Sequence, residues 1–414
     1  MDFTFSDAML DLRDRVRAFV DGRVIPVELE VEAAFDAEVG PGRPFPEVME
    51  RLREEARSED LWNLFLPDAE YGAGLSHHEY GLVCAEMGRS LAAPTAFNCE
   101  APDTGNMEIL LEYGTEEQRE RWLRPLLEGR ARSGFSMTEP DTAGSEPTGL
   151  QTRAARDGDD WVISGHKWFT TGAIGAAFLI VMAVTDPDAE PHRRASLLIM
   201  PTDAEGFEIL RCPPVLGHAG KPGHCEVVYN DVRVPASSML GERGQGFAVA
   251  QARLGPGRIH HCMRAIGHAD RAIELMCERA RVRQVRNGVL ADQQMIQDFI
   301  ARSRIEADQA RLMVLYAAWR MDAFGKKQAA REISMAKVAA AQMAQRVVDR
   351  AIQVHGGLGV TDDTPLAGLS RNARTLRLVD GADEVHKIVV ARRELAAERS
   401  PSASFGQKGA LSGR

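Results

Sequence analysis

The chain has 414 residues and a formal net charge of −10, with 44% hydrophobic and 27% charged residues. This length exceeds the size at which a single hydrophobic core keeps growing, so we expect two or three domains. The acidic balance, which no cluster of Lys and Arg offsets, argues against a general nucleic-acid-binding protein.

The six cysteines are dispersed, and the sequence contains neither a CxxC pair nor a Cys/His set with zinc spacing. We therefore expect six reduced thiols, no metal site and a cytoplasmic protein. The N-terminal segment has no basic region followed by an apolar run, which argues against a signal peptide. The longest apolar stretch, residues 174–184, is too short to span a bilayer, so no membrane insertion is expected.

Helical spacing dominates the first third of the chain. Ser6 suits the N-cap of the first helix, and Leu12, Val16 and Phe19 follow it at helical intervals. Further helices are predicted over residues 46–57, 79–89, 104–112 and 116–128. We assign residues 1–133 to an N-terminal helical domain.

Short β-rich runs with turn signals between them replace the helices near residue 133. The predicted strands cover residues 161–163, 168–171, 177–185, 195–201, 207–211 and 226–234. Because no long helix interrupts them, residues 134–243 are predicted to form a β-barrel or a β-sandwich.

Long helical segments return after residue 246, over residues 259–281, 293–324 and 329–355. Helices of this length usually form a bundle, so residues 244–396 are predicted to be a C-terminal helical bundle. The remaining residues, 397–414, are small, polar and glycine-rich, which is typical of a flexible tail. The expected fold is thus an α+β protein of several lobes, in the order helical, β, helical.

Four segments carry residues suited to ligand binding or catalysis. The loop FSMTEPDTAGS (135–145) either presents N–H groups and a Thr hydroxyl to a flat polar ligand or faces solvent. The strand WVISGHKWFTTG (161–172) suits the core of a β-barrel. The glycines of QVHGGLG (353–359) either cap a helix or bring backbone close to a ligand. Asp380, in VDGADEVH, either caps a helix with Asp383 at the N3 position or serves as a base in a cleft.

Taken together, these segments resemble one family, the acyl-CoA dehydrogenases. TEPDTAGS resembles the family's TEPxxGSD loop with one extra residue, and QVHGGLGV resembles its Q-x-x-G-G-x-G helix end. WVISGHKWFTTG is similar to the family's aromatic strand. RNARTLRLVDGADEV resembles the segment with the catalytic base, and it places Asp380 where most members carry Glu. The resemblance covers about residues 3 to 395, with every motif in order.

The resemblance implies an N-terminal helical domain, a middle β-barrel and a C-terminal four-helix bundle that bind FAD and assemble as a homotetramer of paired dimers. Part of each FAD would contact a neighbouring subunit. The residues that the resemblance assigns to FAD are Phe135, Met137, Thr138, Phe169, Thr171, Arg283, Gln353, Gly356 and Gly357. Those that it assigns to acyl-CoA are Ser145, Arg258 and Gly381. Arg258 suits a structural salt bridge equally well.

The implied activity is FAD-dependent α,β-dehydrogenation of an acyl-CoA thioester to the trans-2-enoyl-CoA, as in fatty-acid β-oxidation. Asp380 would take the α-proton, and the β-hydride would pass to flavin N5. Hydrogen bonds to the thioester carbonyl would stabilise the charge that develops there. An electron-transfer flavoprotein is the implied electron acceptor.

Departures from the family pattern keep two alternatives open. Asp380 is one methylene shorter than Glu, which reduces its reach by about 1.5 Å, and nitroalkane oxidases, which share the fold, also use Asp here. Arg286 and Asn287 stand where the family commonly has Phe-Gly against FAD. Gly257, before Arg258, excludes the helix position that carries the base in other branches. The alternatives are a flavin oxidase or monooxygenase and a non-catalytic flavin-binding member.

Overall fold

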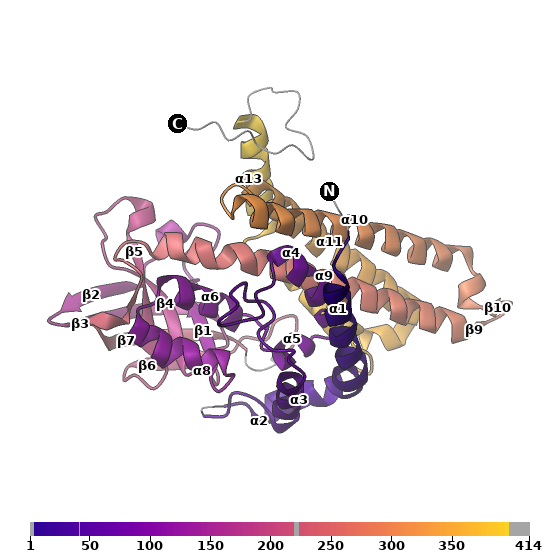
Figure 1. Cartoon of the computed structure of the whole chain (residues 1–414), viewed down its shortest axis with the longest axis horizontal. Helices are drawn as coiled ribbons and strands as arrows, with labels where there is room; N and C mark the ends of the chain where they lie inside the picture. Colours follow the sequence, from indigo (N-terminus) through magenta and orange to yellow (C-terminus); the bar gives the residue numbers. More distant parts are fainter. Residues whose placement is uncertain (1–3, 41, 219–222, 397–414) are drawn as a thin grey trace.

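A computed structural model describes residues 4–40, 42–218 and 223–396 of the chain. The chain forms an N-terminal helical lobe, a β lobe and a C-terminal lobe of long helices, as the sequence analysis expected (Figure 1). The β lobe lies at one end of the molecule in Figure 1, and the long helices extend from it to the opposite end. The predicted tail, residues 397–414, lies outside the described residues.

The N-terminal lobe begins with a capped helix, as predicted. The hydroxyl of Ser6 accepts a hydrogen bond from the N–H of Met9, and Ser76 and Glu79 form a reciprocal capping box at α4. The elements of this lobe are α1 (Asp7–Phe19), η1 (Val20–Val24), η2 (Ile25–Val27), α2 (Glu28–Glu38), α3 (Glu47–Ser58), α4 (His77–Met87), α5 (Ala93–Ala96), α6 (Asp103–Tyr113), α7 (Glu116–Gln118), η3 (Arg119–Leu123) and α8 (Arg124–Leu127). The sequence analysis missed α2, whose single fully buried residue, Val31, leaves almost no hydrophobic periodicity.

The β lobe is an eight-stranded sheet in which β1 lies between β3 and β4. Its strands are β1 (Ser133–Ser136), β2 (Arg153–Asp157), β3 (Asp160–Thr171), β4 (Phe178–Val184), β5 (Ala195–Pro201), β6 (Phe207–Arg211), β7 (His224–Pro235) and β8 (Met239–Leu240). The two predicted runs at 161–163 and 168–171 are parts of the single strand β3. A register shift between Lys167 and Thr170 interrupts its pairing with β7, which is why the alternation is broken there.

Strand β4 joins the β lobe to the helices, and all of its side chains are buried. Leu179 and Val181 pack in the interior of the β lobe. Phe178 and Ile180, on the other face, belong to the large core formed with the helical lobes. Successive side chains of β4 point to opposite faces and therefore pack into two different cores, which fixes the β lobe against the helices.

The C-terminal lobe consists of three long helices and two shorter ones. They are α9 (Gly246–Val282), α10 (Gln294–Phe324), α11 (Ala330–His355), α12 (Leu366–Leu376) and α13 (Asp383–Ala396), with the hairpin β9 (Gln284–Val285) and β10 (Gly288–Val289), and the single turns η7 (Leu290–Asp292) and η8 (Gly356–Val360). Helix α9 begins 13 residues earlier than predicted and continues through Pro256. Proline has no N–H for the carbonyl of Ala252, and that oxygen accepts from Lys326 Nζ instead, at 3.4 Å.

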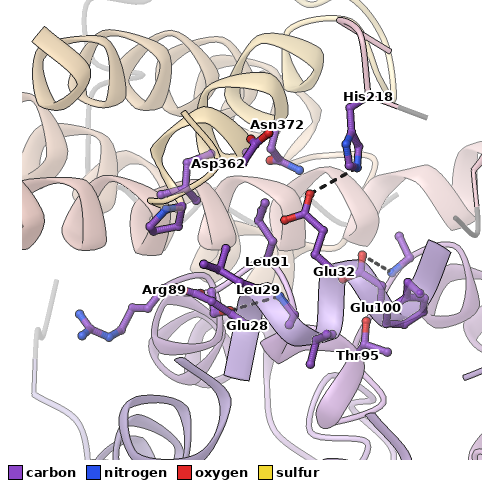
Figure 2. Close-up of a pocket in the computed structure, with 18 of the residues that line it drawn as sticks. Glu28, Leu29, Glu32, Arg89, Leu91, Thr95, Glu100, His218, Asp362 and Asn372 are labelled. Carbon is purple, nitrogen blue, oxygen red and sulfur yellow. Dashed lines mark hydrogen bonds and ion pairs between the residues drawn. The ribbon is translucent and has the colours of Figure 1, made fainter. Parts of the chain in front are cut away.

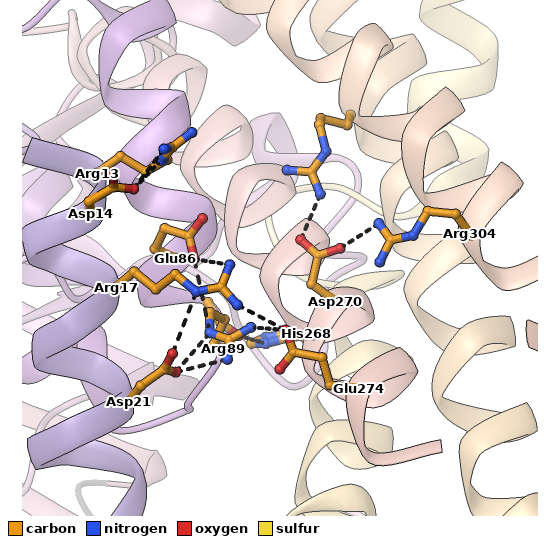
Figure 3. A network of polar contacts seen from close by, with 12 residues as sticks. Arg13, Asp14, Arg17, Asp21, Glu86, Arg89, His268, Asp270, Glu274 and Arg304 are labelled. Carbon is orange, nitrogen blue, oxygen red and sulfur yellow. Dashed lines mark hydrogen bonds and ion pairs between the residues drawn. The ribbon is translucent and has the colours of Figure 1, made fainter. Parts of the chain in front are cut away.

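A network of ion pairs ties the N-terminal lobe to α9 (Figure 3). Arg89, which follows α4 and is 4% exposed, lies 2.8 Å from Asp21 and 2.6 Å from Glu274. One turn earlier in α9, Asp270 pairs with Arg304 of α10 at 2.9 Å. These contacts hold three helices in a fixed arrangement, because a buried guanidinium requires its partners to stay in place.

The expectation of six reduced thiols is wrong for two of them. Cys212 and Cys225 form a disulfide, with Cα atoms 4.2 Å apart. Cys225 lies on β7, and Cys212 follows β6, its antiparallel neighbour. Sheet pairing thus brings the two residues together, and sequence spacing alone did not reveal this.

Candidate active site

Five of the residues assigned to the flavin lie on one edge of the β lobe. Phe135 of β1 pairs with Thr171 of β3. The loop that follows β1 stays close to β3, because the N–H of Trp168 donates to the carbonyl of Thr138 at 3.0 Å. Met137 lies between these points, and Phe169 stands on β3. The structure therefore brings together the set Phe135, Met137, Thr138, Phe169 and Thr171.

A buried ion pair, to which the sequence analysis gave no role, holds the loop after β1 against β3. Lys167 Nζ lies 3.1 Å from Glu139 Oε1 and donates to the carbonyl of Met137 at 2.7 Å. Burial lowers the pKa of Lys167 to about 8. Burial opposes ionisation of Glu139, but Lys167 and the N–H groups of Gln151 and Thr152 hold its pKa at about 2. Glu139 lies in the motif FSMTEPDTAGS and Lys167 in the motif WVISGHKWFTTG. Nothing else in the sequence indicated that the two residues pair.

The exposed face of β3 suits a flat aromatic ligand. Phe169 is 43% exposed and has a φ of 49°, an unusual backbone conformation for a bulky residue. Two residues on, the hydroxyl of Thr171 lies 2.8 Å from Nδ1 of His224. Burial lowers the pKa of His224, which favours the neutral imidazole. An uncovered ring beside a fixed hydroxyl is the arrangement that stacking on a planar ligand requires.

A cavity of about 330 Å³ adjoins Thr171 where the three lobes meet (Figure 2). Its wall includes Glu32 of α2, His218 of the β lobe and Asn372 of α12. His218 lies 3.4 Å from Glu32 and links two of the lobes across the cavity. Asp380 is not among the residues that line this cavity.

Asp380 lies in the turn between α12 and α13 and does not cap a helix. Helix α13 begins at Asp383, and the N–H of His386 donates to the carbonyl of Ala382. The alternative of a capping box with Asp383 at N3 is therefore wrong. Asp383 instead accepts hydrogen bonds from Arg377 and Gln342, at 2.8 and 3.0 Å. This leaves the carboxylate of Asp380 available for chemistry.

The Asp380 turn has an unusual backbone that several side chains hold in place. Asp380 and Gly381 have φ values of 54° and 101°. The carbonyl of Asp380 accepts from Arg258 Nε at 2.8 Å and lies 3.3 Å from His386 Nε2. Buried Lys337 of α11 donates to the carbonyls of Leu376 and Gly381. Arg258 thus positions the turn through a hydrogen bond, which the sequence analysis left open.

The carboxylate of Asp380 faces helix α9 and is surrounded by cationic groups. Burial alone would raise its pKa, but the neighbouring His261 and the cations Arg253, Arg258 and Lys337 together hold the pKa below its usual value. The side chain keeps 20% of its surface exposed. It is therefore ionised at neutral pH and still reachable, as a general base must be.

His261 is the neighbour of Asp380 that sequence reasoning missed. Its Nε2 lies 3.5 Å from Oδ2 of Asp380. It stands one helical turn after Gly257, whose missing side chain leaves room beside the same oxygen. The spacing of four residues places both on one face of α9. That spacing was visible in the sequence, but nothing in it pointed to Asp380, 119 residues further on.

The remaining assigned residues lie elsewhere on the surface of this chain. Ser145 is exposed in the loop after Thr138. Arg283 is exposed at the end of α9, and the 37 residues of that helix span about 55 Å from the β lobe. Gln353, Gly356 and Gly357 are exposed at the end of α11 and the turn after it. None of these last four residues lines the cavity beside Thr171.

The described residues fit a bound flavin better than a metal ion. The exposed ring of Phe169, the hydroxyl of Thr171 and the backbone around Thr138 form one uncovered edge. Within the described ranges, the His, Cys, Asp and Glu side chains form no group that could hold a metal ion. In that same part of the chain, no helix combines the length and apolar character needed to cross a bilayer.

Three family models match the chain, in the order of its lobes. They are the N-terminal domain of acyl-CoA dehydrogenase over residues 6–130, the middle domain over 134–232 and the C-terminal domain over 244–395. Probable acyl-CoA dehydrogenase FadE2 of Mycobacterium tuberculosis is 48% identical over 407 residues, which are 98% of this chain and 99% of that protein. Acyl-CoA dehydrogenase family member 11 of Homo sapiens is 43% identical over 92% of this chain, which spans about half (49%) of that protein.

Solved structures agree with the family models. A Mycobacterium abscessus protein of the same family superposes with a TM-score of 0.90 and 46% identity, covering 95% of this chain and 99% of that one. Butyryl-CoA dehydrogenase from Megasphaera elsdenii superposes with a TM-score of 0.82 and 28% identity, covering 95% of this chain and 100% of that one. A glutaryl-CoA dehydrogenase from Mycobacterium smegmatis, solved in complex with FADH2, superposes with a TM-score of 0.80 and 26% identity, covering 95% of this chain and 96% of that one.

The helical–β–helical order and the residues of the β lobe define the acyl-CoA dehydrogenase fold. The chain belongs to the acyl-CoA dehydrogenase family.

Proposed function

We propose that the protein catalyses the α,β-dehydrogenation of an acyl-CoA thioester to the trans-2-enoyl-CoA, with Asp380 as the base that takes the α-proton. The observation that carries this proposal is the position of Asp380. Its carboxylate stands clear of the helix end, faces Gly257 and His261, and is ionised at neutral pH. A base that is already ionised, partly exposed and fixed by its backbone satisfies the geometric requirement for proton abstraction.

FAD is the cofactor that this site suits. Thr138, Phe169 and Thr171 would hold the isoalloxazine ring, with Phe135 and Met137 beside it. FAD, when bound, supplies the acceptor for the β-hydride at N5. As the family resemblance implies, Arg283, Gln353, Gly356 and Gly357 would hold part of the FAD of a neighbouring subunit. The proposal therefore includes a homo-oligomer.

The chain itself stabilises the substrate and the turn that carries the base. The N–H of Asp380 would donate to the thioester carbonyl as negative charge develops there. Gly381 and Arg258 would keep that N–H in place by fixing the turn, and Ser145 would lie along the CoA arm. After it takes the α-proton, Asp380 would stay protonated until product leaves. The surrounding cations, Arg253 and Lys337, favour its return to the ionised form.

Asp380→Asn tests the role of the base directly. We expect anaerobic addition of acyl-CoAs to bleach the flavin of the wild-type protein and to bleach the variant about 10²- to 10⁴-fold more slowly. The flavin content should stay unchanged, because the amide has the shape of the carboxylate. Full activity in Asp380→Asn, or no bleaching of the wild-type protein with any chain length, would refute the proposal.

The same titration separates the alternative functions. A flavin oxidase or monooxygenase would reoxidise rapidly in air, with release of peroxide in the oxidase case, whereas a dehydrogenase bound to product reoxidises slowly. A non-catalytic member would bind flavin without bleaching. An electron-transfer flavoprotein as acceptor, a part in fatty-acid β-oxidation and a cytoplasmic location stay predictions.

A further inference from the structure

On the face of α9 that is turned towards Asp380, two side chains form a series of contacts that leads to the carboxylate of Asp380. Arg264 Nη2 lies 3.0 Å from His261 Nδ1, and His261 Nε2 lies 3.5 Å from Asp380 Oδ2. We propose that His261, oriented by Arg264, is a positioning residue that aims the carboxylate of Asp380 by donating a hydrogen bond from Nε2. This inference rests on the proposed role of Asp380 as the base.

Arg264 determines which nitrogen of His261 carries the proton. A guanidinium has donors only, so Nδ1 must accept from it and cannot itself carry a proton. The proton of the neutral ring therefore lies on Nε2, the nitrogen that faces Asp380. Arg264 is 6% exposed, and its Nη1 lies 3.4 Å from the carbonyl of Cys99, so it has little freedom to release Nδ1.

The distance of 3.5 Å from Nε2 to Oδ2 suits a group that acts once substrate is bound. In resting enzymes, catalytic hydrogen bonds are often long and shorten in the substrate complex. Gly257 lies one turn before His261, and a Cβ there would stand 3.5 Å from the same oxygen. The carboxylate therefore has space to rotate on this face, and His261 offers the donor that selects one orientation.

The charges around Asp380 cannot supply this direction themselves. The cations Arg253 and Arg258 reach it from α9, and Lys337 reaches it from α11. The neutral His386 of α13 contacts only the backbone carbonyl of Asp380. Glu108 of α6 acts on the same cluster through Arg253. Arg258 binds the backbone carbonyl rather than the carboxylate. These cations favour the ionised form from several sides, whereas His261 is a neutral donor that points at one oxygen.

His261 is unsuited to act as a second base. Burial, helped by Arg264, lowers the pKa of His261 to about 3, so the ring stays neutral over the working range of the enzyme. Its Nδ1 is occupied by Arg264, and its Nε2 already carries a proton. It therefore has no free lone pair to accept the α-proton, and orientation of Asp380 is the role left to it.

Two substitutions at position 261 test the contributions of Nδ1 and Nε2 separately. In His261→Gln, the amide nitrogen can reach the place of Nε2 and keep a donor for Asp380. In His261→Asn, the shorter amide reaches only the place of Nδ1 and leaves Asp380 without the donor. We expect kcat to fall about 10- to 100-fold in His261→Asn and less than about 5-fold in His261→Gln, with KM nearly unchanged. His260→Asn, a neighbouring buried histidine, is the matched control for folding effects.

The pH profile of kcat/KM adds a measurement that would not change if His261 served only in packing. Loss of the donor should raise the pH of the acid limb of kcat/KM by about one unit in His261→Asn, because the ionised carboxylate is less stabilised. His261→Gln and His260→Asn should keep the wild-type limb. Equal losses in the Asn and Gln variants with an unmoved limb would overturn the inference.

Nitrogen NMR of the full chain labelled with ¹⁵N-histidine tests the tautomer without any turnover. We expect His261 to show a proton on Nε2 between pH 5 and 9, and Arg264→Gln to weaken that preference. A proton on Nδ1, or titration near pH 6.5, would refute the inference even if Asp380 proves to be the base. Conversely, an Nε2 proton in a protein that no acyl-CoA reduces would refute the dehydrogenase proposal and leave the assigned geometry intact.

Discussion

Gly257 lies directly opposite the carboxylate of Asp380, so that a Cβ at position 257 would stand 3.5 Å from Oδ2. This distance is an ordinary van der Waals contact, and a larger side chain would have to enter the space beside the base. We expect Gly257→Ala to keep most of its activity and Gly257→Leu to lose about 100-fold in kcat, because proton abstraction depends on near-attack geometry. Stopped-flow bleaching of the flavin measures both. Equal rates in the two variants would contradict the prediction.

The backbone at Gly381 should tolerate no side chain. Its φ is 101°, and a Cβ would meet His386 Nε2 at 3.0 Å. We expect Gly381→Ala to destabilise the protein by about 1–3 kcal/mol and to reduce flavin bleaching, because the strain falls on the turn that carries Asp380.

Gly356→Ala is the control for backbone strain. Gly356 also has a positive φ, 64°, but nothing lies within 4 Å of its Cβ position. Urea unfolding of both variants should show a smaller loss for Gly356→Ala. A larger loss at position 356 would argue that contacts at Gly381 are unimportant.

The acid side of the pH profile should show no group titrating near neutrality. The pKa of Asp380 lies below its usual value, and burial lowers the pKa of His261 to about 3 and that of His386 to about 4. The other charged groups that face Asp380 are Arg253, Arg258 and Lys337. We expect kcat/KM to stay level from about pH 8 down to about pH 5 and to fall only below that. An acid limb near pH 6.5 would show that a histidine at the site becomes charged.

Glu108 should make the stability of the protein depend on pH. Both of its carboxylate oxygens are buried without a hydrogen-bond partner, and burial raises the pKa of Glu108 from 4.5 to about 8. A raised carboxyl pKa favours the folded state fully below pH 4.5, and that contribution is lost as the pH rises towards 8. Relative to wild type, Glu108→Gln should therefore gain on the order of 2 kcal/mol between pH 5 and pH 8.

Glu112→Gln is the control for Glu108. Glu112 lies one turn further along α6 with its side chain 51% exposed, 3.8 Å from Lys326. Thermal melts across the pH range should show a flat difference from wild type for Glu112→Gln and a rising one for Glu108→Gln. Parallel curves for the two variants would mean that Glu108 stays ionised in the folded protein.

Arg283 should contribute to FAD binding only across a subunit interface. We expect Arg283→Ala to weaken FAD binding about 10- to 100-fold, because a charged hydrogen bond to phosphate is lost. Arg281→Ala, also exposed at the end of α9, should bind FAD normally. Fluorescence titration of the apoprotein gives both constants, and sedimentation at each concentration shows whether the oligomer is present. Equal affinities for the two variants would remove Arg283 from the FAD site.

Local sequence signals predicted much of the fold. The cap at Ser6 and the bounds of β5 and β6 agree with the structure, because capping hydroxyls and short apolar runs between turns act within a few residues. The helical–β–helical order followed from the same local patterns. The β-lobe residues that the resemblance assigns to the flavin lie in two continuous motifs, which pair as neighbouring strands.

Contacts between distant segments decided the rest. Helix α9 continues through Pro256, because Lys326, 70 residues further on, donates to the carbonyl that the proline leaves free. Local sequence signals at Asp380 favoured a helix cap over a base. In the structure, α13 begins at Asp383, and the carboxylate of Asp380 faces α9. The sequence by itself determined the family, the order of the lobes and the candidate base. Only the tertiary structure decided that Asp380 faces His261, because that contact joins α9 to the turn before α13, and these segments meet only when the helices pack around a shared core.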